Sequence, residues 1–354
     1  MRICRNRGNR SAYFPARRKT DGMKKKVTLS DIAKACNTSN VTISKALAGK
    51  SGVSEELRAK IISTAGEMGY VPVKQSAADG NIGILIPEKF INPNGSFYWA
   101  LYNCLVQRFK KENISCIQEN ITYEEEQALV MPKLLSGNRT IGVISLGQLR
   151  GEYIEKLLSQ KLPVLLLDYY QTENDADCIV TNGFFGGYKL TSYLISEGHT
   201  QIGFVGTRLA TSSIFDRYMG YMKAMLEHNL PIIEEWIILD REVNNELFPH
   251  ISFPEKLPTA LVCNCDETAY KVIRGLKARG LSVPEDISVV GYDNYLISEI
   301  CDPPITTINV DAGEMADLAV ATLLERLNRP SMPTRIQILD GKLVYKQSVK
   351  PLSK

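Results

Sequence analysis

The sequence predicts an α/β fold in two parts: an N-terminal three-helix domain containing a helix-turn-helix, and a larger domain of two lobes, each a doubly wound parallel sheet. Three runs with helical spacing of apolar residues lie within residues 27–72. After them, strand-like runs alternate with amphipathic segments of helix length, a pattern typical of parallel sheets. Because this alternation is too long for one small sheet and pauses near residues 178–187, we expect two lobes with a cleft between them.

The composition is that of a globular protein with two or three domains. The chain has 354 residues, 44% apolar and 23% charged, and no apolar run approaches the roughly 18 residues of a membrane span. The eight cysteines form no C-x-x-C pair, and Cys263 and Cys265 alternate within a strand-like run, so reduced thiols are expected rather than a metal site. No apolar segment of a secretion signal is found near residue 1. We therefore expect a cytoplasmic protein with no cofactor and no membrane contact.

Positive charge is concentrated at the N-terminal end. Residues 1–80 contain sixteen Lys or Arg against six Asp or Glu, a net charge of +10, whereas the whole chain carries +3 and the remainder therefore −7. Basic ends favour partners with phosphate groups. Residues 1–26 are predicted to form a disordered basic extension, and we expect translation to begin at Met23, which opens directly onto structured sequence.

Small hydroxyl side chains mark the helix starts of the first domain. Thr28 and Asp31 have the spacing of a capping box, in which both side chains accept hydrogen bonds from free amides at a helix start. Ser39 and Ser54 are placed to cap a second and a third helix. The predicted inner faces consist of Leu29, Ile32, Ala33, Cys36, Ile43, Ala46, Leu47, Leu57, Ile61, Ala65 and Met68.

The second helix has the side chains that the major groove of DNA requires. A helix fits this groove, its first residues reach base edges, and hydroxyl groups suit phosphates. The alternative is an ordinary polar face in contact with water. The predicted DNA-contacting residues are Thr28, Ser39, Asn40, Val41, Thr42, Ser44 and Lys45.

The larger domain, residues 82–354, follows a short linker at 74–81. Predicted strands begin at residues 82, 140, 163, 202, 259 and 287, and predicted helices span 97–112, 186–197, 215–229 and 266–279. Ligands of such sheets bind beyond the carboxyl ends of the strands. Polar or aromatic side chains follow these strands, and the predicted ligand-binding residues are Phe97, Tyr98, Asn182, Arg217, Asp266 and Asp293. The alternatives are a helix cap for Asp266 and a surface ion pair for Arg217.

Catalytic motifs are not found in the sequence. There is no G-x-S-x-G, H-E-x-x-H or P-loop, and "GFFGG" at 183–187 does not fit the dinucleotide fingerprint G-x-G-x-x-G. We expect a binding protein rather than an enzyme. A sugar-binding protein without a regulatory role is the alternative, which the predicted helix-turn-helix disfavours.

Specific motifs extend along most of the chain: "VTLSDIAKA", "SNVTISKAL" and "GYVP" within the first domain, then "SEGHTQIGFVG", "FDRYMGYMKAM", "TALVCNCDETA" and "GLSVPEDISVVGYDN". On these motifs the chain resembles the lactose/galactose repressor family of bacterial transcriptional regulators, over about residues 27–350. The resemblance implies a periplasmic-binding-protein-like second domain, a homodimer on palindromic operator DNA, and a small effector, a sugar or sugar derivative. It assigns effector contacts most firmly to Arg217 and Asp266.

A departure from that family pattern limits the resemblance. The segment "PVKQSAADGNIG" has Asp79 and Gly80 in the region of the leucine that the family inserts into the minor groove, and a carboxylate is a poor wedge beside phosphates. We therefore expect no such wedge. No heptad repeat follows "VYKQSVKPLSK", so a dimer is expected and not a tetramer.

Overall fold

The computed structural model describes residues 27–47, 52–68, 80–91, 97–137, 139–171, 175–242 and 246–352. The chain divides into two compact units, Met1–Gln75 and Ser76–Lys354. The predicted basic extension, and residues 74–79 of the predicted linker with Asp79, lie outside the described residues.

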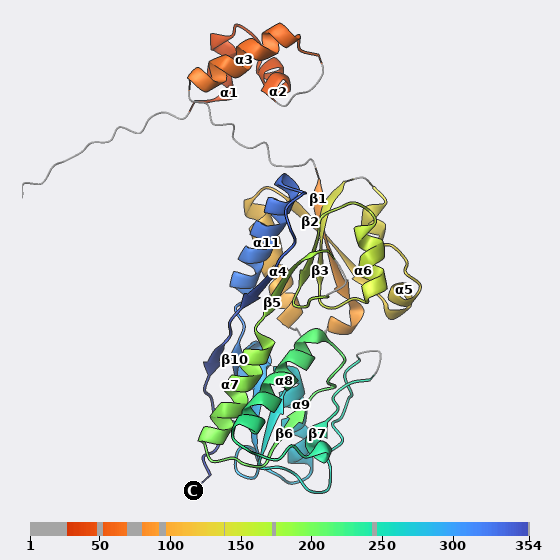
Figure 1. Ribbon diagram of the computed structural model, residues 1–354, viewed down its shortest axis with the longest axis vertical. Coiled ribbons are helices and arrows are strands. Elements are labelled where there is room, and N and C mark those ends of the chain that lie inside the picture. Colours follow the sequence, from red (N-terminus) through yellow and green to blue (C-terminus); the bar gives the residue numbers. More distant parts are fainter. Residues whose placement is uncertain are drawn as a thin grey trace, which may run out of the picture. The chain divides into compact units, whose positions relative to one another are not determined.

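The first unit contains three helices, α1 (Leu29–Ala35), α2 (Asn40–Leu47) and α3 (Glu55–Glu67) (Figure 1). The predicted capping box is confirmed, because Thr28 and Asp31 exchange side-chain and backbone hydrogen bonds at the start of α1. The hydroxyls of Ser39 and Ser54 accept hydrogen bonds from backbone amides at the starts of α2 and α3, as predicted. The core of the unit is built from the predicted inner-face residues together with Val27 and Val53.

Lobe 1 of the second unit is a parallel sheet in the order β11-β5-β4-β3-β1-β2. Its strands are β1 (Asn81–Pro87), β2 (Ser115–Ile121), β3 (Thr140–Leu146), β4 (Val164–Leu167), β5 (Asp177–Thr181) and β11 (Ile336–Leu339). Helices α4 (Phe97–Lys111) and α11 (Ala312–Asn328) cover one face, and α5 (Tyr123–Gln127) and α6 (Gly151–Leu158) lie on the other side (Figure 1). Each face buries its own apolar cluster, as a sheet covered on both sides requires.

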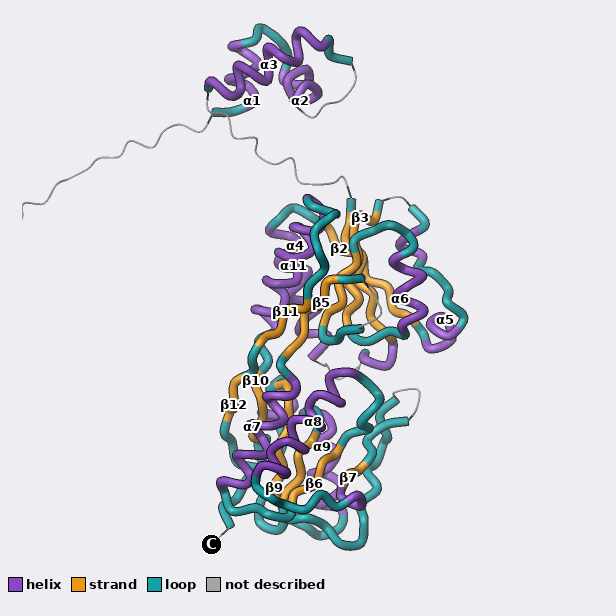
Figure 2. The backbone as a smooth tube through the Cα atoms, viewed as in Figure 1, coloured by secondary structure: helices purple, strands orange, loops and turns teal. Residues whose placement is uncertain are grey.

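Lobe 2 repeats this plan in the order β12-β10-β9-β8-β6-β7. Its strands are β6 (Ile202–Val205), β7 (Ile237–Ile238), β8 (Ala260–Cys263), β9 (Ser288–Asp293), β10 (Thr306–Asn309) and β12 (Lys342–Val344), and only β12 pairs antiparallel among these six. The helices are α7 (Gly183–Ser196), α8 (Ser212–Glu227) and α9 (Asp266–Ala278), which Figure 2 labels, and the short α10 (Leu296–Ile300). Short 3₁₀ helices lie at Glu88–Phe90, Lys133–Leu135 and Glu234–Trp236.

The chain passes between the lobes three times, from β5 to α7, from β10 to α11 and from β11 to β12. Two of these crossings are tied together at Asn182. Its side-chain amide donates to Asp340 Oδ1 at 2.8 Å, and its backbone amide donates to the Leu339 carbonyl at 2.7 Å. Asn182 also caps α7, because its side chain accepts from the Phe185 amide. Asn182 therefore has a structural role where the chain crosses between the lobes.

The glycines of "GFFGG" have a packing role at the first turns of α7. A Cβ atom added to Gly187 would overlap the backbone carbonyl of Arg217 on α8, and one added to Gly186 would overlap the ring of Tyr292. Glycine at 187 lets α7 and α8 approach closely, and glycine at 186 leaves room for the Tyr292 ring of β9. The segment "GFFGG", which does not match a nucleotide-binding motif, thus packs against the backbone of Arg217, a residue predicted to bind the ligand.

None of the helices in the described part of the chain is both long and apolar enough to cross a membrane. Within the same residues, no three His, Cys, Asp or Glu side chains gather in a way that could hold a metal ion.

Candidate functional site

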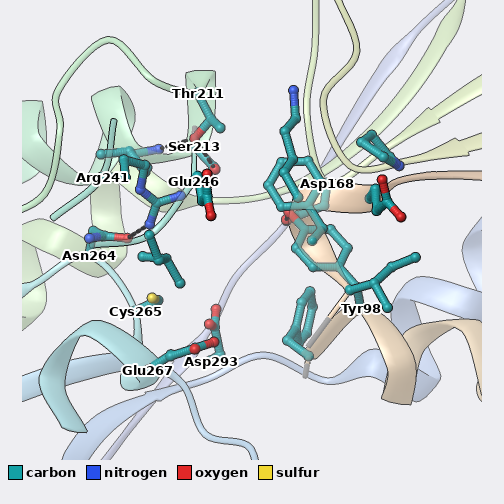
Figure 3. A pocket seen from close by; sticks show the side chains of 18 of the residues that line it. Tyr98, Asp168, Thr211, Ser213, Arg241, Glu246, Asn264, Cys265, Glu267 and Asp293 are labelled. Atoms are coloured by element: carbon teal, nitrogen blue, oxygen red, sulfur yellow. Dashed lines mark hydrogen bonds between the residues drawn. The ribbon is translucent and has the colours of Figure 1, made fainter. Parts of the chain in front are cut away.

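A cavity of about 510 Å³ lies between the two lobes of the second unit, beyond the carboxyl ends of several parallel strands (Figure 3). This is where the sheet topology predicts a ligand site. Lobe 1 contributes Pro87, Glu88, Lys89, Phe90, Ile91, Phe97, Tyr98, Ile121, Tyr123, Glu126 and Asp168. Lobe 2 contributes Thr211, Ser213, Ile214, Arg217, Arg241, Glu246, Leu247, Asn264, Cys265, Glu267, Lys271, Asp293 and Tyr295.

Arg217 is one of two buried arginines in the cavity lining, with 6% of its surface exposed. One terminal nitrogen donates to the Asn264 carbonyl at 2.6 Å, the other lies 3.6 Å from Asp293 Oδ1, and the guanidinium stacks 3.8 Å from the centre of the Tyr292 ring. Its buried Nε has no hydrogen-bond partner among the described residues. A buried donor of this kind is costly unless a ligand satisfies it.

Asp293 ends β9 with 8% of its surface exposed and a φ of 112°, in the region that favours glycine. Strained backbone that the surrounding fold holds in place is common at binding sites. Burial raises the pKa of Asp293 well above its usual range, and Arg217 opposes this shift. Burial acts to lower the pKa of Arg217, but the combined electrostatic influence of Asp293, Tyr292 and Asp168 raises it above its usual value.

Asp168 directly follows β4 and lines the cavity from lobe 1. Its carboxyl is buried, with 4% of the residue surface exposed. The Tyr98 hydroxyl, from the first turn of α4, donates to Asp168 Oδ2 at 2.8 Å. Burial raises the pKa of the Asp168 carboxyl, against the influence of Arg217 and the Tyr98 hydrogen bond. Phe90 lies beside Tyr98, with ring centres 4.7 Å apart, and Phe97 contacts the same ring edge-on.

A buried polar network supports the lobe 2 wall. Arg241 donates from two nitrogens to the fully buried Asp240, at 3.0 and 2.8 Å. The side chains of Asn264 and Thr268 also donate to Asp240, at 2.7 and 2.8 Å. Although burial opposes ionisation, these donors lower the pKa of Asp240 to about 2. The network fixes Arg241 and Asn264 in place at the cavity surface.

The structure brings four of the six predicted ligand residues to the cavity: Phe97, Tyr98, Arg217 and Asp293. Asn182 lies at the crossings between the lobes, as described above, and Asp266 is absent from the cavity lining. Asp266 is fully buried as the first residue of α9 and accepts a hydrogen bond from Thr307 Oγ1 at 2.6 Å. Burial raises its pKa to about 7. Neither side chain lines the cavity, so we do not carry these two residues forward as direct ligand contacts.

Sequence reasoning missed Asp168, Asn264 and Arg241. The same rule that selected the other residues would have found two of them, since Asp168 follows "PVLLL" and Asn264 follows "TALVC". Arg241 follows β7, which spans only two residues and gives no recognisable strand signal.

The DNA-contacting residues predicted on α2 lie on its outer side. Asn40, Val41 and Lys45 are exposed, Val41 to 64%, and Thr42 and Ser44 are half-buried. Ser39 caps the helix and its hydroxyl also contacts Thr42 Oγ1 at 2.9 Å. At the other end of α2, Arg58 donates to the Ala46 carbonyl at 3.0 Å and ties α2 to α3. Thr28 caps α1 and keeps an exposed position.

Comparison with known protein families gives two matches. Residues 28–73 match the family described as bacterial regulatory proteins, lacI family, and residues 191–349 match the family described as periplasmic binding protein-like domain. The first match covers α1 to α3, and the second covers most of lobe 2 and the last segments of lobe 1.

Individual relatives align over almost their whole length. The HTH-type transcriptional repressor PurR of Actinobacillus pleuropneumoniae is 28% identical over 338 residues, which covers 92% of this chain and 99% of that protein. The ribose operon repressor of Haemophilus influenzae is 28% identical over 332 residues, covering 91% of this chain and 98% of that protein. Among solved structures, the lac repressor dimer bound to operator and an anti-inducer superposes with a TM-score of 0.61 at 22% identity, covering 92% of this chain and 100% of that chain.

Proposed function

We propose that the chain is a sequence-specific transcriptional repressor, because it belongs to the lacI family of bacterial regulatory proteins. In this proposal a small polar ligand, a sugar or sugar derivative, binds between the lobes and sets the affinity for a palindromic operator. One observation supports this proposal most strongly: the same chain has a helix, α2, with an exposed polar outer side, and a cavity with a buried arginine whose Nε lacks a hydrogen-bond acceptor.

On the DNA side, α2 enters the major groove of each half-site. In this proposal Asn40 and Val41 read base edges, and Lys45 contacts a guanine or a phosphate. Thr42 and Ser44, which are less exposed, hold phosphates together with the helix-start amides.

On the ligand side, Arg217 donates to ligand oxygens through its unpartnered Nε, and Asp168 and Asp293 accept hydrogen bonds from hydroxyl groups. The rings of Phe97 and Tyr98 offer the apolar faces on which a sugar ring packs. The name of the ribose operon repressor supports a sugar as the ligand.

The proposal includes a homodimer, since one three-helix unit reads only a few base pairs and twofold symmetry matches a palindromic site. It also places the protein in the cytoplasm, where its DNA is, and gives it no catalytic role, as its relatives are transcriptional repressors. A sugar-binding protein without a regulatory role remains disfavoured by α1 to α3 and their family match.

Ligand and operator are coupled because the lobes are joined at three crossings and rotate about them. A ligand that contacts Asp168 of lobe 1 and Arg217 of lobe 2 biases the angle between the lobes. Lobe movement in a dimer changes the spacing of the two DNA-binding units, so ligand and operator act on one equilibrium. Reciprocity then requires operator DNA to change ligand affinity by the same factor as the ligand changes operator affinity.

The test is binding-site selection with the full chain, followed by fluorescence anisotropy on the selected operator with and without each member of a sugar panel. We expect a palindromic site and at least one sugar that changes operator affinity. Arg217→Ala should abolish the ligand effect and keep operator binding, whereas Lys45→Ala should weaken operator binding and keep ligand affinity. Selection that recovers no preferred sequence would overturn the repressor proposal.

A further inference from the structure

We propose that the ligand carries a positive charge, as an amino sugar or another polyhydroxylated amine does, and that its ammonium group binds between Asp168 of lobe 1 and Asp293 of lobe 2. This inference rests on the proposed function and goes further by naming the charge class of the ligand. Four observations on the cavity support it.

The cavity lining has an excess of acidic groups. Its six carboxylic side chains are Glu88, Glu126, Asp168, Glu246, Glu267 and Asp293, and its basic side chains are Lys89, Arg217, Arg241 and Lys271. The sequence stretches 92–96 and 243–245, which adjoin lining residues along the chain, contain no Lys or Arg. An anionic ligand such as a sugar phosphate would therefore enter a field of its own sign, and a cation enters an attractive one.

Each of the four cations in the lining already has an acceptor within the protein. Lys89 lies 3.4 Å from Glu126 Oε2, and Lys271 donates to the Phe248 carbonyl at 3.0 Å. Arg241 is paired with Asp240, and Arg217 donates to Asn264 and faces Asp293. A phosphate or carboxylate would compete with these partners for the same cations, and among the buried nitrogens of these four side chains only Arg217 Nε has no acceptor.

The two carboxylates that face each other across the cleft are poorly neutralised. No Lys, Arg or His nitrogen of the described residues lies within 4 Å of Asp168, whose donor is the neutral Tyr98 hydroxyl. Asp293 Oδ1 lies 3.6 Å from a terminal nitrogen of Arg217, which is longer than the roughly 2.7–2.9 Å of a tight charge-assisted hydrogen bond. Burial raises the pKa of both carboxyls, and the nearby positive charge of Arg217 does not offset this effect.

Aromatic rings complete the surroundings of these carboxylates. Phe90, Phe97 and Tyr98 form a contiguous group on the lobe 1 wall (Figure 3 shows Tyr98 and Asp168 on the same side of the cavity). Ring faces attract cations electrostatically, and more strongly when water is excluded. Carboxylates next to ring faces suit an ammonium group attached to a sugar ring, since the ring packs on the aromatic side chains while the charge meets Asp168.

The experiment uses the full-length protein and sugars that differ in one group. Each set holds a hexose, its 2-amino-2-deoxy form, the N-acetyl derivative and the 6-phosphate, in the gluco, galacto and manno series, measured by isothermal titration calorimetry. We expect at least one amine to bind at least tenfold more tightly than its neutral hexose and its N-acetyl derivative, and no phosphate to bind. N-acetylation is the sharpest control because it removes the charge and retains the nitrogen.

The variant Asp168→Asn should weaken binding of that amine at least tenfold and reduce its advantage over the neutral sugar. Glu112→Gln is the matched control, because Glu112 is an exposed carboxylate outside the cavity lining. Retained operator binding by Asp168→Asn shows that the variant is folded. If that variant fails to fold, the wild-type comparison of amine, hexose and N-acetyl derivative still decides the question.

The inference is overturned if a neutral or phosphorylated sugar binds as tightly as its amine, if no amine of the panel binds, or if Asp168→Asn leaves amine affinity unchanged. The outcome is separable from the proposed function. A neutral sugar that binds and changes operator affinity keeps the proposed function and removes only the charge inference. An amine that binds without changing operator affinity keeps the charge inference and removes ligand control.

Discussion

The Tyr170 hydroxyl of lobe 1 donates to Asp216 Oδ1 on α8 of lobe 2 at 3.1 Å, so a side-chain hydrogen bond joins the two lobes beside the cavity. A second bond lies on the same turn of α8, where the Ser212 backbone amide donates to Gln148 Oε1 of lobe 1 at 2.8 Å. Arg217 follows Asp216 in sequence. The two bonds therefore hold lobe 1 against the part of α8 that presents Arg217 to a ligand.

Tyr170→Phe is expected to weaken ligand binding while leaving the fold intact. The substitution removes one hydrogen bond between the lobes, worth about 1 kcal/mol, and so makes the lobe arrangement of this structure less populated in the absence of ligand. We expect a loss of roughly fivefold in ligand affinity by calorimetry. Tyr345→Phe is the control, because this exposed tyrosine lies outside the cavity lining. Equal affinities for wild type and Tyr170→Phe would mean that this bond does not stabilise the lobe arrangement that binds the ligand.

Gly187→Ala should destabilise the second unit and disturb the ligand site together. The new methyl group would meet the Arg217 carbonyl, which is backbone and has no rotamer to change, so α7 and α8 must separate. We expect a loss of roughly 1–3 kcal/mol in the free energy of unfolding by urea denaturation, accompanied by weaker ligand binding. Gly151→Ala, where an added Cβ meets no atom within 4 Å, serves as the control. A Gly187→Ala protein as stable as wild type would contradict the close helix contact.

Local sequence chemistry predicts the first unit well. A hydroxyl side chain before an apolar-periodic run has few roles other than capping, and Thr28, Ser39 and Ser54 all cap the helices that the pattern indicates. Each helix is short, and its inner face is determined by spacing within the same segment. The helices and the core of this unit can therefore be predicted without knowing which distant residues pack against it.

The larger unit shows where such reasoning ends. Four predicted helices appear nearly as expected, but β11 and β12 come from residues 336–344 and complete two different sheets, a pairing that no local pattern specifies. Similarly, Asp168 and Asp266 both follow strands, yet only Asp168 faces the cavity. Asp168 has a φ of 69°, whereas Asp266 begins a helix after β8 and accepts a hydrogen bond from Thr307 of β10, two strands away in the sheet. Backbone direction at a strand end depends on the assembled sheet.

Lys45→Ala is expected to identify the role of the charged residue on α2. If Lys45 reads a guanine, the variant should lose about 1–3 kcal/mol on the selected operator and its preference at one base pair; if Lys45 contacts a phosphate, all sequences should weaken alike and the salt slope should fall by about 1. Lys60→Ala removes the same charge from an exposed site on α3 and serves as the control. Anisotropy titrations over several salt concentrations distinguish these results, and unchanged affinity and preference would remove Lys45 from the interface.

The pH dependence of stability should reveal the buried carboxyl of Asp266. Burial raises its pKa from 3.8 to about 7 in the folded protein, so between these values the folded state holds a proton that the unfolded state has released. A state that binds more protons is favoured at lower pH, and the contribution of Asp266 to stability therefore falls as pH rises from about 4 to about 7 and is constant above that range.

Asp266→Asn should remove this contribution, because an amide does not titrate and its oxygen still accepts the hydrogen bond from Thr307. Urea unfolding of wild type and variant at pH 5 and pH 8 gives the two differences that are compared. We expect the variant to gain stability relative to wild type on going from pH 5 to pH 8, while the exposed substitution Glu112→Gln leaves the difference unchanged. Parallel pH profiles for Asp266→Asn and wild type would show that Asp266 ionises in the folded protein at its ordinary pKa. That result would in turn imply that water or Lys346 reaches a side chain that the structure shows as fully buried.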